Sequence, residues 1–444
     1  MRGETMAKDR ETTMGSRELA IQKHRSMLID AKNLILRGAP GTGKTYLAKQ
    51  IAASVVSNGE IDRYEDLGPE QKAQIEFVQF HPSYDYVDFV EGLRPKLNDD
   101  GSMGFELRDG IFKQFVDRAI RNYENSRKTI EAIAKEKVVR DSMECFFNHV
   151  DFGKTEYPKI NGSVFTITGV DDKRVYVGEN ETSDKPRIKL DEIRKLLLSD
   201  EQFDSVTAVA SFFGRSRQQE DSYYLPIFQK IKEKEADIAT DSKAGVEREE
   251  LKNFVFIIDE INRGEMSKIF GELFFAIDPG YRGEAGAVST QYANLHSDPD
   301  GKFYIPENVY IIGTMNDIDR SVGSFDFAMR RRFRFVELKA NDSLEMLSAL
   351  GDKKKEASAK MLALNNAIAS DEDLNENYQV GAAYFLKLKT LSFDELWADY
   401  LKPLLQEYIQ GTYNEKSRMS RFKKAYDNAA FNQGDLNEIA QNQG

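Results

Sequence analysis

One octapeptide constrains this chain more than any other segment: residues 38–45 read Gly-Ala-Pro-Gly-Thr-Gly-Lys-Thr. They follow an apolar run at residues 33–36 and precede residues 46–52, whose pattern is helical. A strand, a glycine-rich turn and a helix start form the context of a phosphate-binding P-loop. The turn directs several backbone N–H groups at one anion, and the helix N-terminus adds partial positive charge. A glycine-rich turn with a chance lysine is the alternative, and the flanking pattern argues against it.

The P-loop pattern assigns a role to its polar residues. Lys44 is expected to reach the β- and γ-phosphates, and the Thr45 hydroxyl is expected to bind Mg²⁺. The residues expected to bind the nucleotide are Gly38, Ala39, Pro40, Gly41, Thr42, Gly43, Lys44, Thr45 and Tyr46. The residues alone leave open whether that nucleotide is GTP or ATP.

A second site follows a long apolar run. Residues 253–258 are continuous in β-branched and aromatic side chains, which is typical of a strand buried on both faces of a parallel sheet. The run ends in Asp259 and Glu260, at the carboxyl end of a strand, where α/β sheets place ligands. We expect Asp259 to hold the Mg²⁺ and Glu260 to polarise the water that attacks the γ-phosphate. A surface turn after a strand is the alternative for these two acids.

A third apolar run, residues 309–314, leads to further polar residues. Asn316 at the end of this strand can hydrogen-bond the attacking water or a γ-phosphate oxygen. Three consecutive arginines follow at residues 330–332, among apolar neighbours. Arginine forks suit phosphate recognition and can act on a neighbouring subunit's nucleotide. One of the residues 330–332 is therefore expected to reach a neighbour's nucleotide, with Arg331 and Arg332 as the candidate catalytic residues and Arg330 left open. A run of charges is, however, more often a solvated face.

Composition and charge indicate how many domains the chain forms, which partners it favours and in which compartment it is found. A chain of 444 residues with an apolar fraction of 40% is long enough for two or three domains with real cores. Its net charge of −12 argues against broad nonspecific adhesion to nucleic acid, but not against a local basic patch. The single cysteine, Cys145, excludes an internal disulfide and favours a reducing cytoplasm. No apolar stretch reaches the length of a membrane span, so no membrane contact is expected.

Four segments are predicted along the chain. Residues 1–124 hold an N-terminal segment and the P-loop half of the core, residues 251–340 hold its second half, and residues 341–444 form a helical small domain. Residues 125–250 separate the two halves as an α+β insert. Within it, arginines stand beside aromatic residues at 211–217. Such a pattern can bind nucleic acid, but we favour the reading in which the aromatics pack in the insert's own core, because the charge there is mixed.

Several of these motifs together resemble one family. The chain resembles an AAA+ ATPase-fold motor and, more narrowly, the McrB-type GTPase subunit of modification-dependent (5-methylcytosine-type) restriction systems. The resemblance covers residues 30–120 and 250–390. The segments that carry it are the P-loop and residues 79–84, 89–92, 258–263, 267–272, 315–321 and 328–333.

Two places depart from the family pattern. The family signature around Asn316 usually reads Met-Asn-Thr-Ala-Asp-Arg-Ser, and this chain has Asp317 and Ile318 at the Thr-Ala positions, while Asp319, Arg320 and Ser321 are kept. This change weakens the inference of a GTP preference more than that of nucleotide hydrolysis. In the small domain, alanines stand at residues 382–383, where the family has a small polar residue or histidine, so no polar role is expected there.

The resemblance implies a fold, partners and cofactors. The fold is α/β, with an AAA+ P-loop NTPase core built on a parallel sheet, the α+β insert before the Walker B strand, and a helical lid domain. The implied assembly is a homo-oligomeric ring, usually a hexamer, that hydrolyses GTP with Mg²⁺ and powers a separate McrC-like nuclease subunit. The segment before Asn33 is too short for a separate DNA-reading domain, so DNA contact is expected through the insert or the partner.

Two other functions share most of these residues. One is an ATP-hydrolysing remodelling chaperone of the MoxR or dynein-related type, which a preference for ATP would support. The other is a nucleotide-gated scaffold whose hydrolysis is incidental. Because both Lys44 and Glu260 are present, the sequence favours an enzyme over a scaffold.

Overall fold

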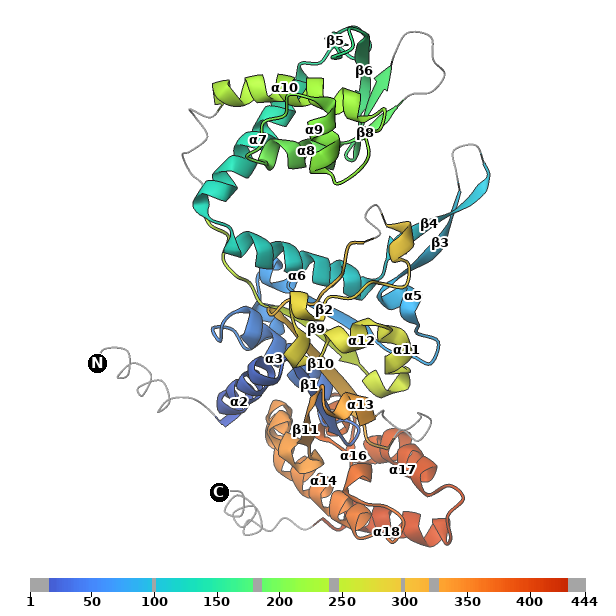
Figure 1. Cartoon of the computed structure of the whole chain (residues 1–444). Helices are drawn as coiled ribbons and strands as arrows, with labels where there is room; N and C mark the ends of the chain where they lie inside the picture. The colour runs from blue at the N-terminus through green and yellow to red at the C-terminus, as the bar shows by residue number, and fades with distance from the viewer. Residues whose placement is uncertain are drawn as a thin grey trace, which may run out of the picture. The chain divides into compact units, whose positions relative to one another are not determined.

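The computed structural model describes residues 16–97, 101–178, 186–238, 247–296, 300–318 and 327–429. The chain divides into two compact units, and each is described by itself (Figure 1). One unit comprises Met1–Tyr123 and Leu251–Gly444, and the other is Glu124–Glu250. The family-signature residues Asp319, Arg320 and Ser321 lie outside the described residues.

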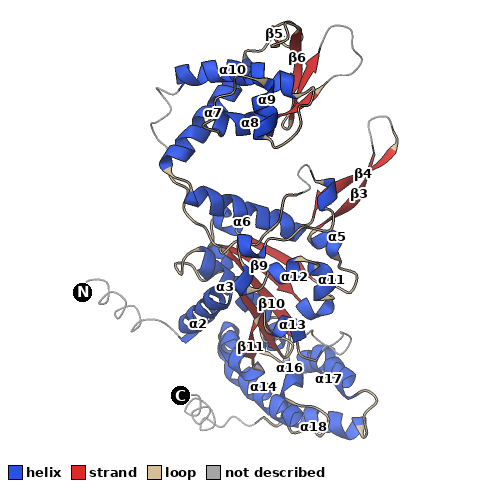
Figure 2. Cartoon of the chain, in the orientation of Figure 1, coloured by secondary structure: helices blue, strands red, loops and turns tan. Residues whose placement is uncertain are grey.

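A five-stranded parallel sheet forms the centre of the first unit, and its strands are drawn in red in Figure 2. The strand order is β11-β1-β10-β9-β2. Every pairing in this sheet is parallel. The inner strands are almost wholly buried, as expected of continuous apolar runs in parallel sheets. The predicted α/β fold with a parallel sheet is thereby confirmed. The strands are β1 (Asn33–Gly38), β2 (Ile75–Gln79), β9 (Phe254–Asp259), β10 (Val309–Asn316) and β11 (Arg334–Leu338).

Helices cover both faces of this sheet. Alternate side chains of a strand point to opposite faces, so an apolar strand has apolar side chains to bury on each face. Leu36 and Val255 enter the core under α2 (Ser16–Ala31) and α3 (Lys44–Val56). Ile35 and Phe256 enter a second core on the opposite face. Among the helices that contribute to this second core are α5 (Tyr86–Phe89), α6 (Ile111–Arg127), α11 (Met266–Phe270) and α12 (Leu273–Ala276). The short helices of this part are η1 (Tyr64–Asp66), α4 (Pro69–Lys72), η2 (Ile261–Arg263), η3 (Pro279–Tyr281), η4 (Glu284–Gly286), η5 (Ala293–Leu295) and α13 (Phe327–Arg330).

A β-hairpin, separate from the central sheet, joins α5 to α6. Its strands β3 (Glu91–Leu97) and β4 (Met103–Asp109) are antiparallel, with Leu97 opposite Met103. The hairpin exposes large apolar side chains, and Phe105 is 74% exposed.

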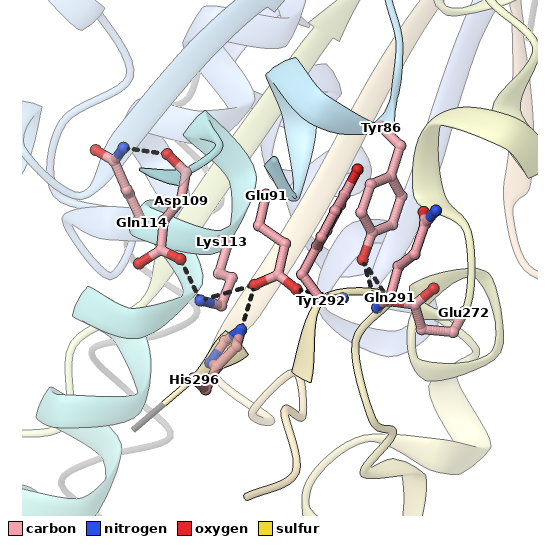
Figure 3. A network of polar contacts seen from close by, with 9 residues as sticks. All are labelled: Tyr86, Glu91, Asp109, Lys113, Gln114, Glu272, Gln291, Tyr292 and His296. Carbon is pink, nitrogen blue, oxygen red and sulfur yellow. Dashed lines mark hydrogen bonds and ion pairs between the residues drawn. The ribbon is translucent and has the colours of Figure 1, made fainter. Parts of the chain in front are cut away.

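The buried carboxylate of Glu91 connects the base of the hairpin to the long loop that contains Tyr292 and His296 and precedes β10 (Figure 3). Glu91 is fully buried, and its Oε2 lies 2.8 Å from His296 Nε2 and 3.3 Å from Lys113 Nζ. Its Oε1 accepts a 3.2 Å hydrogen bond from the backbone N–H of Tyr292. Lys113 also pairs with Asp109 at the end of β4. These contacts hold together segments that are about 200 residues apart in the sequence.

A second carboxylate holds the same loop. Glu272 Oε1 accepts hydrogen bonds from the Tyr86 hydroxyl at 2.5 Å and from the backbone N–H of Gln291 at 3.0 Å (Figure 3). The loop is therefore fixed at two neighbouring points, although it contains little regular structure.

The C-terminal part of the first unit is helical. Its core includes Leu364, Phe385, Trp397 and Phe422, and also Ala39 of the P-loop. The helical part therefore packs directly against the P-loop. Its elements are η6 (Ala340–Lys353), α14 (Lys354–Ala369), η7 (Glu376–Tyr378), α15 (Ala382–Phe385), η8 (Leu386–Lys389), α16 (Phe393–Leu396), η9 (Trp397–Leu401), α17 (Lys402–Ile409) and α18 (Glu415–Asp427).

The second unit is an α+β module with its own core. A four-stranded antiparallel sheet, in the order β5-β6-β7-β8, packs one face against helices. Tyr223 and Tyr224 are buried in that core, and Phe212 and Phe213 pack against it. Arg215 forms ion pairs with Glu192 and Asp221. The favoured interpretation, that these aromatic side chains pack in the core of the insert, is confirmed. The elements are α7 (Ile130–Asn148), β5 (Glu156–Pro158), β6 (Val164–Val170), β7 (Arg174–Gly178), β8 (Arg187–Lys189), α8 (Leu190–Leu198), α9 (Val206–Phe212) and α10 (Asp221–Ile238).

Candidate nucleotide-binding site

The P-loop connects β1 to α3 and has no room for larger residues at two of its glycines. A Cβ atom on Gly38 would lie 2.2 Å from the carbonyl oxygen of Leu338, and one on Gly41 would lie 2.6 Å from the ring of Tyr384. Gly41 and Gly43 also have φ angles of 77° and 85°, which side chains disfavour. The curled backbone expected of a phosphate-binding loop is therefore specified by its glycines.

Lys44 lies beneath this loop. Its Nζ donates hydrogen bonds to the carbonyl oxygens of Gly38 at 3.0 Å and Ala39 at 2.8 Å, and the residue is 7% exposed. Burial lowers the pKa of Lys44 to about 8, against the opposing effect of the nearby Glu260, Asp317 and Asp259 charges. The ammonium group is thus held within the loop that is expected to surround the phosphates.

Two hydroxyl groups converge on the carboxylate of Asp259. Thr45 Oγ1 donates a 2.7 Å hydrogen bond to Asp259 Oδ1, and Thr314 Oγ1 donates a 2.6 Å hydrogen bond to the same oxygen. The hydroxyl of Thr314 also accepts a 3.2 Å hydrogen bond from the backbone N–H of Glu260. The structure brings Thr45 and Asp259 together, and it adds Thr314, which sequence reasoning missed.

Two oxygen donors suited to Mg²⁺ lie next to the P-loop. Among the described residues, no cluster of three or more His, Cys, Asp or Glu side chains can hold a metal by itself. The Thr45 hydroxyl and the Asp259 carboxylate are hard oxygen donors close together, as in sites that bind Mg²⁺ through one or two protein groups plus phosphates and water. The donor set therefore fits Mg²⁺ bound together with a nucleoside triphosphate.

Glu260 is held in an unusual conformation beside Asn316. Its φ angle is 52°, in the left-handed region that a non-glycine residue adopts at a cost. Asn316 Nδ2 donates a 2.6 Å hydrogen bond to Glu260 Oε1, and Asn262 Nδ2 donates a 3.4 Å hydrogen bond to the carbonyl oxygen of Asn316. Arg263 Nε lies 3.6 Å from Glu260 Oε2. Glu260 and Asn316, the residues expected to activate and position water, therefore contact each other at the carboxyl ends of β9 and β10.

Asp317, at the departure from the family signature, lies next to the P-loop strand. Its Oδ2 is 4.0 Å from Arg37 Nε, and Arg37 Nη2 also lies 3.1 Å from Glu337 Oε2. Burial raises the pKa of Asp317, although the charges of Arg37 and Lys44 act to lower it. The substitution therefore places an additional acid near the phosphate site.

The helical domain contacts the P-loop through its backbone. The N–H of Gly381 donates a 2.9 Å hydrogen bond to Pro40 O, and the N–H of Ala383 donates a 2.9 Å hydrogen bond to Gly41 O. Ala382 is fully buried and apolar. Tyr46, at the other end of the motif, is 43% exposed. The small domain thus holds the loop without a polar side chain at residues 382–383.

The arginine block lies far from this site within the same subunit. Arg332 is 6% exposed, its guanidinium lies 4.2 Å from the centroid of the Phe274 ring, and its carbonyl oxygen accepts a hydrogen bond from Asn33. Arg330 and Arg331 are exposed. Asn33 begins β1 and the P-loop follows its other end, about 17 Å away at the usual rise of a strand. The structure does not bring the arginines to the subunit's own P-loop.

Comparison with known proteins agrees with this geometry. Residues 356–417 match the family model of the McrB alpha-helical lid domain, and residues 219–333 match that of the AAA domain of the dynein-related subfamily. The chain is 25% identical over 407 residues, 88% of its length, to the type IV methyl-directed restriction enzyme EcoKMcrB subunit of Escherichia coli K12. The chain is therefore similar to the McrB-type AAA+ proteins over most of its length. The resemblance found in the sequence is thereby confirmed.

A second relative is matched over a shorter length. The chain is 34% identical over 106 residues, 21% of its length, to the type II restriction enzyme BsuMI component YdiS of Bacillus subtilis 168. The matched parts span 57% of the Escherichia coli relative and 31% of the Bacillus subtilis relative. Among the described helices, none is both long enough and apolar enough to cross a membrane.

Proposed function

We propose that this chain is a Mg²⁺-dependent nucleoside triphosphatase, with GTP as the favoured substrate, and the motor subunit of a McrBC-like DNA restriction complex. In this proposal it assembles as a homo-oligomeric ring, a hexamer as is usual in the family, and powers a separate McrC-like nuclease. It acts in the cytoplasm. The observation that carries the proposal is the contact between Glu260 and Asn316 beside a P-loop and the Thr45–Asp259 pair.

The contact between Glu260 and Asn316 suits activation of water. A carboxylate at hydrogen-bonding distance from a water takes up its proton as that water attacks phosphorus, and an adjacent amide orients either the carboxylate or the water. Glu260 has this carboxylate, and Asn316 Nδ2 fixes one of its oxygens. The other oxygen faces Arg263 Nε at 3.6 Å. In the proposed reaction, Glu260 accepts the proton and Asn316 positions Glu260 and the water.

The remaining residues of the site bind and neutralise the phosphates. Backbone N–H groups of residues 38–45 surround the β-phosphate, and Lys44 exchanges its carbonyl partners for phosphate oxygens. Bound Mg²⁺ supplies neutralisation of the charge on the β- and γ-phosphates. Thr45 and Asp259 would hold it, and Thr314 keeps Asp259 oriented.

The position of the arginine block supports assembly with a second subunit. Arg331 is exposed at the end of the sheet opposite to its own P-loop, so it can contact the phosphates of a nucleotide only in a second subunit. Arg330 is exposed as well, whereas Arg332 is buried on Phe274. We propose Arg331 as the trans arginine, with Arg330 as the alternative, and we assign an anchoring role to Arg332.

The proposed restriction role comes from the relatives. Both curated relatives are components of restriction enzymes by name, and one is a subunit. A nuclease partner and DNA as its substrate are consistent with this. In the second unit, Arg215 is engaged by two carboxylates. DNA contact through the partner is therefore better supported than contact through that arginine.

ATP hydrolysis by a remodelling chaperone is the second candidate function. The match of residues 219–333 to a dynein-related AAA domain favours it. Asp317, which replaces the family's threonine, also leaves open whether the site prefers GTP or ATP.

Steady-state hydrolysis of GTP and of ATP by the purified chain tests the proposal. With Mg²⁺, we expect turnover of GTP that exceeds turnover of ATP and that Glu260→Gln reduces by about 10²-fold or more. Nucleotide binding by that variant should persist. A preference for ATP would move the chain to the remodelling class, and full activity of Lys44→Ala would overturn the assigned site.

A further inference from the structure

A buried polar cluster at the amino end of β1 joins three separate segments. Asn33, the first residue of β1, is fully buried. Its Nδ2 donates hydrogen bonds to the carbonyl oxygens of Ile277 at 2.7 Å and Arg332 at 2.8 Å. Its Oδ1 accepts a 2.6 Å hydrogen bond from Arg282 Nη2. One side chain thus connects the end of α12, the start of β1 and the arginine block.

Arg282 determines which way the amide of Asn33 faces. The guanidinium is a charged donor and cannot accept a hydrogen bond, so the amide oxygen must point toward it. Arg282 is 5% exposed, and its Nε and Nη1 have no hydrogen-bond partner among the described residues. Burial lowers the pKa of Arg282 to about 10, so it is still charged at neutral pH. The two N–H groups of Asn33 are therefore directed at Ile277 and Arg332.

The arginine block is fixed on a second side as well. The guanidinium of Arg332 lies over the ring of Phe274 in α12. Met329 and Phe333, on either side of the arginines, are buried in the core. Arg332 is held by its carbonyl and by its side chain, and the exposed Arg331 directly precedes it. The position of the Arg331 backbone is thus set by contacts that do not involve its own side chain.

We propose that Asn33, oriented by Arg282, is a positioning residue that fixes Arg331 for hydrolysis of a neighbouring subunit's nucleotide. This inference rests on the proposed function and adds a component to it. Asn33 begins the strand whose other end leads into the P-loop, so β1 holds the subunit's own nucleotide loop at one end. At the other end it holds the subunit's own arginine block, which acts on the neighbour's nucleotide. A displacement of the Arg332 backbone also displaces Arg331, because the two residues are adjacent. Small errors in the position of a catalytic group lower the reaction rate by large factors.

The test begins with Asn33→Ala in the full chain. This change leaves the carbonyl oxygen of Arg332 without its side-chain donor. We expect hydrolysis to fall by about 10²-fold, while the affinity for a fluorescent nucleotide analogue stays unchanged. The matched control is Asn308→Ala. Asn308 is also buried, at the amino end of β10, and its Nδ2 donates a 2.9 Å hydrogen bond to Lys252 O, but it does not contact the arginine block.

Mixing subunits separates a loss of arginine positioning from damage to the P-loop strand. Glu260→Gln subunits bind nucleotide without hydrolysing it and still present Arg331 to a neighbour. Arg331→Ala subunits have an intact site but present no arginine. If Asn33 acts through Arg331, activity of Asn33→Ala returns when it is mixed with Glu260→Gln, and does not return with Arg331→Ala.

The opposite pattern would overturn the inference. Restoration by Arg331→Ala, or by neither partner, would show that Asn33→Ala damages its own site, and unchanged activity of Asn33→Ala would show that Asn33 positions nothing. Arg282→Met provides a second variant with the same expected pattern if Asn33→Ala fails to fold. Absence of hydrolysis in the unmodified chain would instead contradict the proposed function itself.

Discussion

Thr314 Oγ1 donates a hydrogen bond to Asp259 Oδ1 across neighbouring parallel strands, at 2.6 Å. The same hydroxyl accepts a hydrogen bond from the N–H of Glu260. One threonine therefore orients the proposed metal-binding acid and fixes the backbone of the proposed water-activating acid. Its hydroxyl can do both because it is at once a donor and an acceptor.

Thr314→Val should weaken the use of Mg²⁺ more than the binding of nucleotide. The change keeps the shape of the side chain but removes a hydrogen bond to a charged group, which contributes about 1.5–3 kcal/mol. We expect the Mg²⁺ concentration for half-maximal hydrolysis to rise by about 10-fold or more. Thr314→Ser, which keeps the hydroxyl, is the matched control. An unchanged Mg²⁺ requirement in the valine variant would contradict the role of Thr314.

Glu260 and Asn316 should act as a coupled pair. Asn316→Ala removes the 2.6 Å hydrogen bond to Glu260 and should slow hydrolysis strongly in the unmodified chain. In a Glu260→Gln background the same change should cost much less, because the carboxylate that Asn316 positions is already gone. Turnover rates of the two single variants and the double variant measure this coupling. Additive losses would mean that Asn316 acts on the nucleotide independently of Glu260.

The strands and the main acids could be predicted from the sequence for a clear physical reason. β9 and β10 are continuous apolar runs, which indicate strands buried on both faces, and their last residues necessarily meet at one edge of a parallel sheet. Asp259 and Asn316 are therefore predictable as neighbours. The glycine spacing of residues 38–45 likewise specifies a loop before any coordinates are known.

Other parts of the site depend on contacts that no local pattern records. Thr314 lies inside an apolar strand and contacts an acid 55 residues away. Asn33 contacts Arg332 across 299 residues. The difference between an exposed Arg331 and a buried Arg332 depends on the position of Phe274, which the run of arginines does not reveal. These are tertiary effects, and no periodicity or spacing in the sequence predicts them.

Nucleotide affinity should depend on pH through Lys44. Its pKa in the free protein is lowered to about 8, so below that pH the ammonium is charged before nucleotide arrives. Above it, binding requires uptake of a proton, and the affinity should fall by about tenfold per pH unit until the pKa of the bound state is reached. Titration of a fluorescent analogue between pH 7 and about pH 9.5 measures this. Lys44→Arg, whose charge does not titrate there, should give a flat profile; a flat profile for Lys44 itself would contradict the prediction.

Glu91 should stabilise the first unit in a pH-dependent way. Burial acts to raise the pKa of Glu91, but the hydrogen bond from Thr290 and the charges of Lys113 and His296 together hold it below the ordinary value. A carboxylate with a lowered pKa in the folded state adds stability above its unfolded pKa of about 4.3, and this stability is lost as the pH falls through the folded value.

Replacement of Glu91 by alanine tests this contribution at both ends of the pH range. At pH 7 the change leaves Lys113 without one of its two carboxylate partners, and the loss of one member of a buried ion pair costs about 3–5 kcal/mol. Calorimetry should show a lowered unfolding midpoint, and the difference from the unmodified chain should shrink as the pH falls below about 4.3. Glu106→Ala, in the exposed part of the same hairpin, should change the midpoint little. A difference that stays constant down to acid pH would mean that the packing of Glu91, and not its charge, stabilises the hairpin base.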